Sequence, residues 1–220
     1  MIKPALITGA SSGIGSAIAL KLANENRLVI NAEVNIPGYS HKNIIHRECD
    51  VTKGNDVDVL YSWMLQNTGL PGTLTLNAGK GIHETLTEGD PDKWKSVLDL
   101  NVMGVLRYIR SFVPEMISQK QGKVIFMSSV AASKPYTYGA VYSASKAAVE
   151  MIAETLRLET LPHVAVTTIN AGITDIGEYA GRHYFFMPEA GTTKTTAWGS
   201  ADSWLNNSFF ITSCMYLSGV

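Results

Sequence analysis

Tyr142 and Lys146 lie four residues apart in the segment YSASK. On a helix, two residues at this spacing share one face, so the phenol and the ammonium group lie side by side. A free tyrosine has a pKa of about 10, and a nearby cation lowers that pKa by stabilising the tyrosinate. The pair therefore predicts a general acid/base that works near neutral pH. The alternative is an ordinary helix face along which the lysine stem extends towards solvent.

Two further polar residues favour the chemical interpretation. Ser129 follows a predicted strand at 123–127, at the end where open α/β sheets bind ligands; the alternative is a turn or helix-cap serine. Asn101 interrupts the apolar stripe of a long predicted helix. A buried amide without a hydrogen bond costs about 1–3 kcal/mol. Asn101 is therefore either satisfied structurally or holds a water molecule.

A glycine-rich turn lies between a short apolar run at 5–7 and a predicted helix. Glycines let the backbone turn tightly and approach a pyrophosphate closely, and the helix N-terminus offers unpaired N–H groups to the anion. The turn predicts a dinucleotide site, with a purely structural turn as the alternative. Its candidate binding residues are Gly9, Ser11, Ser12, Gly13, Ile14 and Gly15.

An acidic residue follows the next predicted strand. Glu33 lies 18 residues after Gly15, where dinucleotide sites commonly hold a carboxylate that accepts hydrogen bonds from the adenosine ribose. A carboxylate there would repel a 2′-phosphate, and neither Ser12 nor Val34 supplies a compensating positive charge. The pattern favours NAD over NADP. The alternative is an exposed glutamate at a strand end.

A fold must hold these residues close together. Along the chain, short apolar runs alternate with segments of helical periodicity. Alternating strands and helices predict one α/β domain over 1–220, with a Rossmann-type doubly wound parallel sheet, helices on both faces and three α/β/α layers. Residues 173–208 are predicted to form a substrate loop region, or simply a loose loop, before a last strand at 209–217. The predicted strands are 5–7, 28–30, 43–46, 73–76, 123–127 and 164–169, and the predicted helices are 14–22, 57–66, 91–118 and 142–161.

Composition excludes several other classes. The 220 residues are 45% hydrophobic and 17% charged, which provides a core and argues against disorder. A net charge of −1 gives no global basic field for nucleic acid. Cys49 and Cys214 are too few for a disulfide framework and suggest free thiols. With no apolar run long enough for a membrane span, no signal-peptide pattern and no predicted metal site, we expect a cytoplasmic protein.

Together, the motifs resemble the classical short-chain dehydrogenase/reductase family over about residues 3–172. The 13-residue separation of Ser129 and Tyr142 matches the family spacing. The motifs are TGASSGIG at 8–15, CDVT at 49–52, NAG at 77–79, NVMG at 101–104, SS at 128–129 and YSASK at 142–146.

The resemblance implies an oxidoreductase that interconverts a carbonyl and a secondary alcohol with NAD(H). Tyr142 would exchange a proton with the substrate oxygen, and Ser129 would orient that oxygen. Lys146 would lower the pKa of Tyr142 and bind the nicotinamide ribose, while Asn101 would hold a water linking Lys146 to solvent. The nicotinamide would carry the hydride. The further cofactor contacts implied are Asp50 and Val51 at the adenine, Asn77, Ala78 and Gly79 beside the adenosine ribose, and Gly172 and Thr174 near the nicotinamide.

The resemblance also implies a homodimer or homotetramer, packed through the long helices around Asn101 and Tyr142. Small residues on the second helix permit close packing, and aromatic residues suggest a small to medium, partly apolar substrate; ordinary core or an oligomer contact is the alternative for the aromatics. The small residues are Ala144, Ala147, Ala148 and Ala153, and the aromatic or apolar candidates are Tyr136, Tyr138, Tyr179, Tyr184, Phe185, Phe186 and Met187.

Departures from the family pattern fall mainly on the nicotinamide and substrate side. Leu76 stands where an asparagine is common, Ala171 where a proline is usual and Ile176 where a threonine often holds the carboxamide; Thr174 or Asp175 is a candidate substitute. The chain after Gly172 is shorter than usual, and its ending departs from the familiar final-strand motif. The alternative function is therefore a dinucleotide-binding regulatory protein with weak or no turnover; a structural role without cofactor is a third, lesser alternative.

Overall fold

The computed structural model describes residues 2–172. The strands are β1 (Ala5–Thr8), β2 (Val29–Ala32), β3 (Ile44–Arg47), β4 (Thr73–Leu76), β5 (Gly122–Ser129) and β6 (Val164–Ala171). The helices are α1 (Gly13–Asn24), α2 (Gly54–Asn67), α3 (Pro91–Leu98), α4 (Gly104–Ser118) and α5 (Ala140–Thr160), with a π-helix η1 (Asp99–Met103) and a short 3₁₀ helix η2 (Val130–Ala132).

The strands form one sheet in the order β3-β2-β1-β4-β5-β6, and every pair is parallel. The doubly wound α/β fold predicted from the sequence is thereby confirmed. Strand order reverses direction between β1 and β4, and parallel strands place their carboxyl ends at the same edge. In such a sheet, ligands bind outside the carboxyl ends at this reversal.

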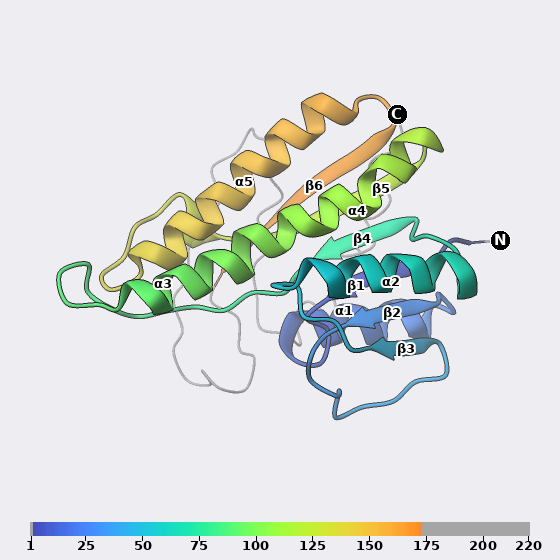
Figure 1. The fold of residues 1–220 in the computed structure, drawn as a ribbon, viewed down its shortest axis with the longest axis horizontal. Helices are drawn as coiled ribbons and strands as arrows, with labels where there is room; N and C mark the ends of the chain where they lie inside the picture. The colour runs from blue at the N-terminus through green and yellow to red at the C-terminus, as the bar shows by residue number, and fades with distance from the viewer. Residues whose placement is uncertain (1, 173–220) are drawn as a thin grey trace.

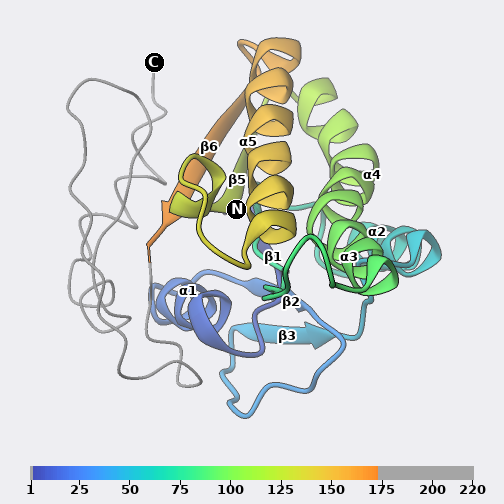
Figure 2. The same cartoon turned by 90° about the vertical axis from the view of Figure 1, so that its left-hand side faces the viewer.

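Helices cover both faces of the sheet. Figures 1 and 2 show α2, α4 and α5 on one face and α1 on the other. The larger core lies under α2, α4 and α5, where Phe126 of β5 packs with Tyr108 and Phe112 of α4. A second core joins Ile18 and Leu22 of α1 to the opposite face of the sheet. Strands buried on both faces explain why their sequences read as short, nearly continuous apolar runs.

The long helix expected at 91–118 consists of three segments. Helix α3 has Pro91 in its first turn, and the Asp90 side chain caps the helix by accepting a hydrogen bond from the Asp92 N–H. Both residues are typical of a helix N-terminus. The helix then widens into the π-helix η1, in which the Gly104 N–H reaches back to the Asp99 carbonyl, before α4 continues. A single π-turn of this kind is commonly found at functional sites, and this one carries Asn101.

Several predictions fall outside the described residues: the loop region at 173–208, the strand at 209–217, Thr174 with the other departures after Gly172, and Cys214. Within residues 2–172, no helix is long and apolar enough to cross a membrane, and no three His, Cys, Asp or Glu side chains gather as a metal site. The Cys49 thiol is buried against the Tyr108 hydroxyl at 3.1 Å, and burial raises its pKa to about 11.

Candidate active site

The glycine turn after β1 has almost no space for side chains. Gly9 and Gly13 have φ angles of +68° and +55°, which residues with a Cβ rarely adopt. A Cβ on Gly15 would lie 2.3 Å from the Gly9 carbonyl oxygen. Glycine is therefore required at these positions by conformation and by close approach, as a phosphate-binding turn requires.

The start of α1 leaves its backbone donors available. Ser12 is the N-cap residue but makes no side-chain cap hydrogen bond, and the first turn holds no acidic residue. By contrast, α3 has both Asp90 as a cap and Asp92 in its first turn. Free N–H groups and the positive end of the helix dipole suit an anion. The residues present at α1 therefore fit the pyrophosphate of a dinucleotide.

The segment just after β4 holds this turn in place through hydrogen bonds in both directions. The Asn77 Nδ2 donates to the carbonyls of Thr8 and Gly9 at 3.0 and 2.9 Å. In return the Thr8 Oγ1 accepts from the backbone N–H groups of Asn77 and Ala78, both at 2.9 Å. Asn77 and Ala78 were predicted site residues, whereas Thr8 was missed; a hydroxyl on the last residue of a buried strand was the available signal.

The segment after β2 holds the other side of the turn. Ser11 donates from Oγ to the Asn35 carbonyl at 2.6 Å, and the Tyr39 hydroxyl donates to the Ala10 carbonyl. Asn31, fully buried within β2, accepts from the Ala10 N–H at 3.2 Å. Sequence reasoning missed Asn31, although an amide inside the apolar strand VINA was a signal. The Ser11 hydroxyl, a predicted cofactor contact, therefore donates its hydrogen bond to the Asn35 carbonyl in this structure.

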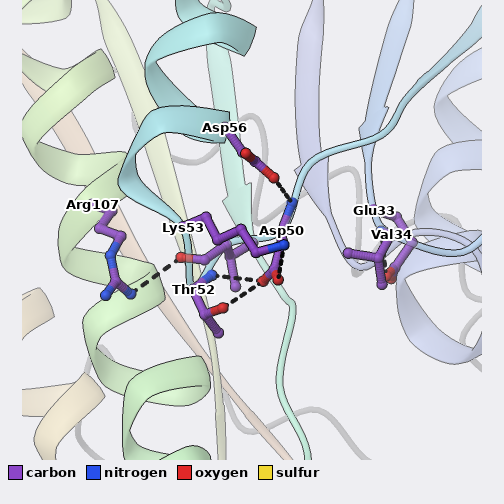
Figure 3. Close-up of polar contacts among 8 residues, drawn as sticks. Glu33, Val34, Asp50, Thr52, Lys53, Asp56 and Arg107 are labelled. Carbon is purple, nitrogen blue, oxygen red and sulfur yellow. Dashed lines mark hydrogen bonds and ion pairs between the residues drawn. The ribbon is translucent and has the colours of Figure 1, made fainter.

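The residues predicted to meet the adenosine lie just after β2 and β3 (Figure 3). Glu33 is half-buried, and its Oε1 accepts from the Val34 N–H at 2.8 Å. Asp50 accepts from the N–H and hydroxyl of Thr52 at 2.9 and 2.7 Å and forms an ion pair with Lys53 at 3.5 Å. Burial raises the pKa of Asp50, but the hydrogen bonds from Thr52 and Lys53 outweigh that effect and lower the pKa below its usual value. The carboxylate is therefore ionised and fixed.

The predicted catalytic side chains converge at the carboxyl end of β5. Ser129 is the last residue of β5; its Oγ accepts from the Ala131 N–H at 3.2 Å, and its hydroxyl acts on the Tyr142 phenol by lowering the pKa of that group. Ser129 therefore caps η2, which confirms the helix-cap interpretation, while its catalytic role stays a prediction. Lys146 is almost fully buried one turn further along α5, and its Nζ donates to the Met127 carbonyl at 2.8 Å.

The structure contradicts the predicted direction of the Tyr142 pKa. Burial raises the pKa of Tyr142, and the hydrogen bond with Ser129 offsets this only in part. The expected lowering by Lys146 is missing because the ammonium lies 5.8 Å from the centre of the phenol ring and donates to a backbone carbonyl instead. Burial also lowers the pKa of Lys146 to about 8.

Asn101 is satisfied by protein groups. It is 1% exposed, its Oδ1 accepts from the Lys80 N–H at 2.9 Å, and its Nδ2 donates to the Lys80 carbonyl and to the Ser145 Oγ, both at 3.0 Å. Ser145 is fully buried and donates to the Tyr142 carbonyl at 2.7 Å. Sequence reasoning missed Ser145, which joins η1 to the turn of α5 that carries Tyr142.

Of three other predicted cofactor residues, Gly79 lies beside this group. A Cβ on Gly79 would be 3.1 Å from the Asn101 Oδ1 and 3.5 Å from the Lys146 Nζ, so the loop after β4 passes directly over both side chains. Val51 is buried against α4. Gly172 follows β6 at the same edge of the sheet.

The buried lysine makes a pH prediction. Between about pH 8 and 10 the unfolded chain binds more protons at Lys146 than the folded chain does, so the stability that this side chain contributes rises with pH. We expect the free energy of unfolding of the wild type, relative to Lys146→Met, to increase by about 2 kcal/mol over this range. Urea denaturation of both proteins at the two pH values measures the difference. A constant or falling difference would show that the ammonium is not desolvated.

Comparison with known proteins agrees with this geometry. The sequence model described as short chain dehydrogenase matches residues 3–182. An uncharacterized oxidoreductase of Listeria innocua is 38% identical over 167 residues, covering 72% of this chain and 67% of the relative.

Solved structures agree as well. A short-chain dehydrogenase from Streptomyces avermitilis has a TM-score of 0.75 at 28% identity, covering 80% of this chain and 68% of that one. The L-sorbose reductase of Gluconobacter frateurii, solved with NADPH and L-sorbose, has a TM-score of 0.74 at 30% identity, covering 80% of this chain and 72% of that one. The glycine turn, the parallel sheet and the family match lead to one conclusion: this chain belongs to the short-chain dehydrogenase family of oxidoreductases.

Proposed function

We propose that this protein uses NAD(H) to interconvert a carbonyl compound and a secondary alcohol, with Tyr142 as general acid/base. The observation that carries the proposal is the gathering of the candidate catalytic side chains at the carboxyl ends of the strands. Asn101 donates to Ser145, and Ser145 donates to the Tyr142 carbonyl. Ser129 acts on the Tyr142 phenol, and Lys146, one turn further along α5, donates to a backbone carbonyl of β5. An uncapped α1 and its glycine turn lie at the same edge of the sheet.

The proposed chemistry divides between the cofactor and the chain. A bound nicotinamide supplies or accepts the hydride. In reduction, the Tyr142 phenol donates its proton to the carbonyl oxygen while the Ser129 hydroxyl hydrogen-bonds the same oxygen and orients it. The raised pKa of Tyr142 keeps the phenol protonated, which suits this direction. In oxidation, the Tyr142 phenolate takes the alcohol proton, a direction that the raised pKa of the phenol disfavours.

Removing the Tyr142 hydroxyl tests the catalytic assignment. Tyr142→Phe is expected to lower kcat by about 10²–10⁴-fold because the proton donor is lost, with little change in NADH affinity. Steady-state rates on a panel of aldehydes and ketones, with NADH binding followed by fluorescence, give both quantities. Tyr61→Phe, on α2, is the matched control. Tight NADH binding without turnover by the wild type on any carbonyl would favour the regulatory alternative.

The NAD preference rests on Glu33. Its carboxylate follows β2, where the adenosine ribose of a dinucleotide would lie, and the next residues, Val34 and Asn35, bring no positive charge. A 2′-phosphate beside this carboxylate would be repelled. The L-sorbose reductase was solved with NADPH, so the preference depends on this chain's own residues.

Titration with NADH and NADPH measures this preference. We expect the wild type to bind NADH at least about tenfold more tightly than NADPH. Glu33→Gln is expected to reduce this ratio of the two affinities, because it weakens the hydrogen bonds to the ribose and removes the repulsion of the 2′-phosphate. Glu25→Gln, which lies just after α1, is the matched control. An NADPH preference in the wild type would refute the role of Glu33 while leaving the dinucleotide site intact.

We also propose a homo-oligomer built on α4 and α5, with a small to medium, partly apolar substrate. Met103, the last residue of η1, and Leu106 of α4 are exposed, and Met151 and Leu158 of α5 are 68% and 76% exposed. Exposed apolar rows on neighbouring helices are typical of an interface. Of the small residues expected there, Ala144 and Ala147 are exposed, but Ala153 is buried in the core because it faces the sheet.

The oligomer has a direct test. Light scattering of the wild type is expected to give the mass of a dimer or tetramer, and Met151→Glu is expected to shift the mass towards the monomer by placing a charge in the contact. Lys95→Ala, an exposed substitution on α3, is expected to leave the mass unchanged. A monomeric wild type would contradict the proposal.

The substrate proposal rests on the segment between η2 and α5. Tyr136 and Tyr138 are 40% and 54% exposed there, a few residues before Tyr142, and the Tyr136 ring contacts His83 from the loop after β4. These rings offer apolar surface with polar tips, as partly apolar ligands require.

A further inference from the structure

Arg107 on α4 makes two hydrogen bonds that the proposed chemistry does not use. Its Nη1 donates to the Val51 carbonyl at 3.2 Å, and its Nη2 donates to the Asp99 carboxylate at 2.8 Å. Val51 belongs to the loop after β3, on the adenosine side, whereas Asp99 opens the π-helix that carries Asn101. One guanidinium thus connects the loop to the helix on which a proposed catalytic residue lies.

Side chains make most of the hydrogen bonds of the loop around Val51, beside a backbone hydrogen bond from the Lys53 N–H to the Asp50 carbonyl at 2.9 Å. Asp50 is fixed by Thr52 and Lys53, and its N–H donates to the Asp56 carboxylate at 3.1 Å (Figure 3). On the opposite side, Val51 packs directly on the α4 backbone, since a Cβ on Gly104 would lie 2.8 Å from its Cγ2.

The hydrogen bond from Arg107 to the Val51 carbonyl is a polar contact between α4 and this loop. Figure 3 shows the Arg107 side chain reaching from α4 to the loop beside Thr52. The charged donor is half-buried, with 23% of its side chain exposed. Hydrogen bonds from a charged group in such a setting are stronger than neutral ones.

We infer that Arg107 is a positioning residue for the adenine half of the cofactor. It fixes Val51 relative to α4, and the bond to Asp99 fixes the guanidinium itself. The inference rests on the proposed dinucleotide function, and it assigns Arg107 to binding rather than to proton or hydride transfer. The planar guanidinium reaches both acceptors at once, which a lysine ammonium at this position does not match.

Calorimetric titration with ADP-ribose tests the inference, because this probe lacks the nicotinamide. Arg107→Met keeps the side-chain length but loses both donors, and it is expected to weaken ADP-ribose binding about tenfold. Arg107→Lys should restore part of that loss. In turnover, KM for the cofactor should rise with kcat unchanged, a split that general damage to the fold does not produce. Lys95→Ala removes an exposed cation from the adjoining α3 and should bind like the wild type.

The binding and kinetic results for Arg107→Met either support or overturn the inference. Wild-type affinity in Arg107→Met would overturn the inference, as would an equal loss of kcat. If Arg107→Met fails to fold, as judged by its thermal transition, the same titration is made with Asp99→Asn. This variant is expected to bind ADP-ribose about threefold more weakly than the wild type. Absence of ADP-ribose binding by the wild type would overturn the dinucleotide site itself, and this inference with it.

Discussion

The close approach of three backbone segments at the carboxyl end of β1 is the constraint on which the structure depends. Gly15 lies against the Gly9 carbonyl with no space for a side chain between them, and Asn77 donates to the carbonyls of Thr8 and Gly9. The first turn of α1, the end of β1 and the loop after β4 are thereby held together. Because the helix start is uncapped, this packing presents backbone N–H groups at the edge where a parallel sheet binds ligands.

A continuous path of contacts leads from this point to the proposed catalytic group. The loop that Asn77 begins passes Gly79, which lies against Asn101 and Lys146, and Lys80 then exchanges hydrogen bonds with Asn101. Asn101 bonds Ser145, which bonds the Tyr142 carbonyl. The loop after β4 thus connects the glycine turn with the α5 turn that bears Tyr142. An oxidoreductase of this family needs such a connection, since hydride transfer depends on the relative position of cofactor and proton donor.

Local patterns predicted the sheet and its helices, and they selected the side chains of the candidate site, whose roles stay predictions. Short apolar runs ending in glycine or polar residues marked the strands, and an asparagine within an apolar stripe marked the only buried side chain of η1. These features depend on neighbours in sequence. The π-turn at Asp99–Met103, the bracing by Thr8 and the bridge through Ser145 depend on contacts between distant segments, so single-sequence periodicity did not reveal them.

Burial explains the main error. The spacing of Tyr142 and Lys146 predicts a lowered phenol pKa, but spacing carries no measure of desolvation or of a competing acceptor such as the Met127 carbonyl. The same limit applies to Ala153, which the sequence interpretation groups with the small residues that permit close packing between subunits but which is buried in the core of this chain.

The central claim is that a dinucleotide binds at the carboxyl ends of β1, β3 and β4, with its phosphates on the start of α1. Backbone amide NMR during an NADH titration tests it most directly, because every residue of the turn reports separately. The account predicts that the largest shifts fall on residues 11–15, with further shifts at 50–51 and 77–79. Saturable binding that perturbs a different edge of the sheet, and leaves the amides of 11–15 unchanged, would contradict it.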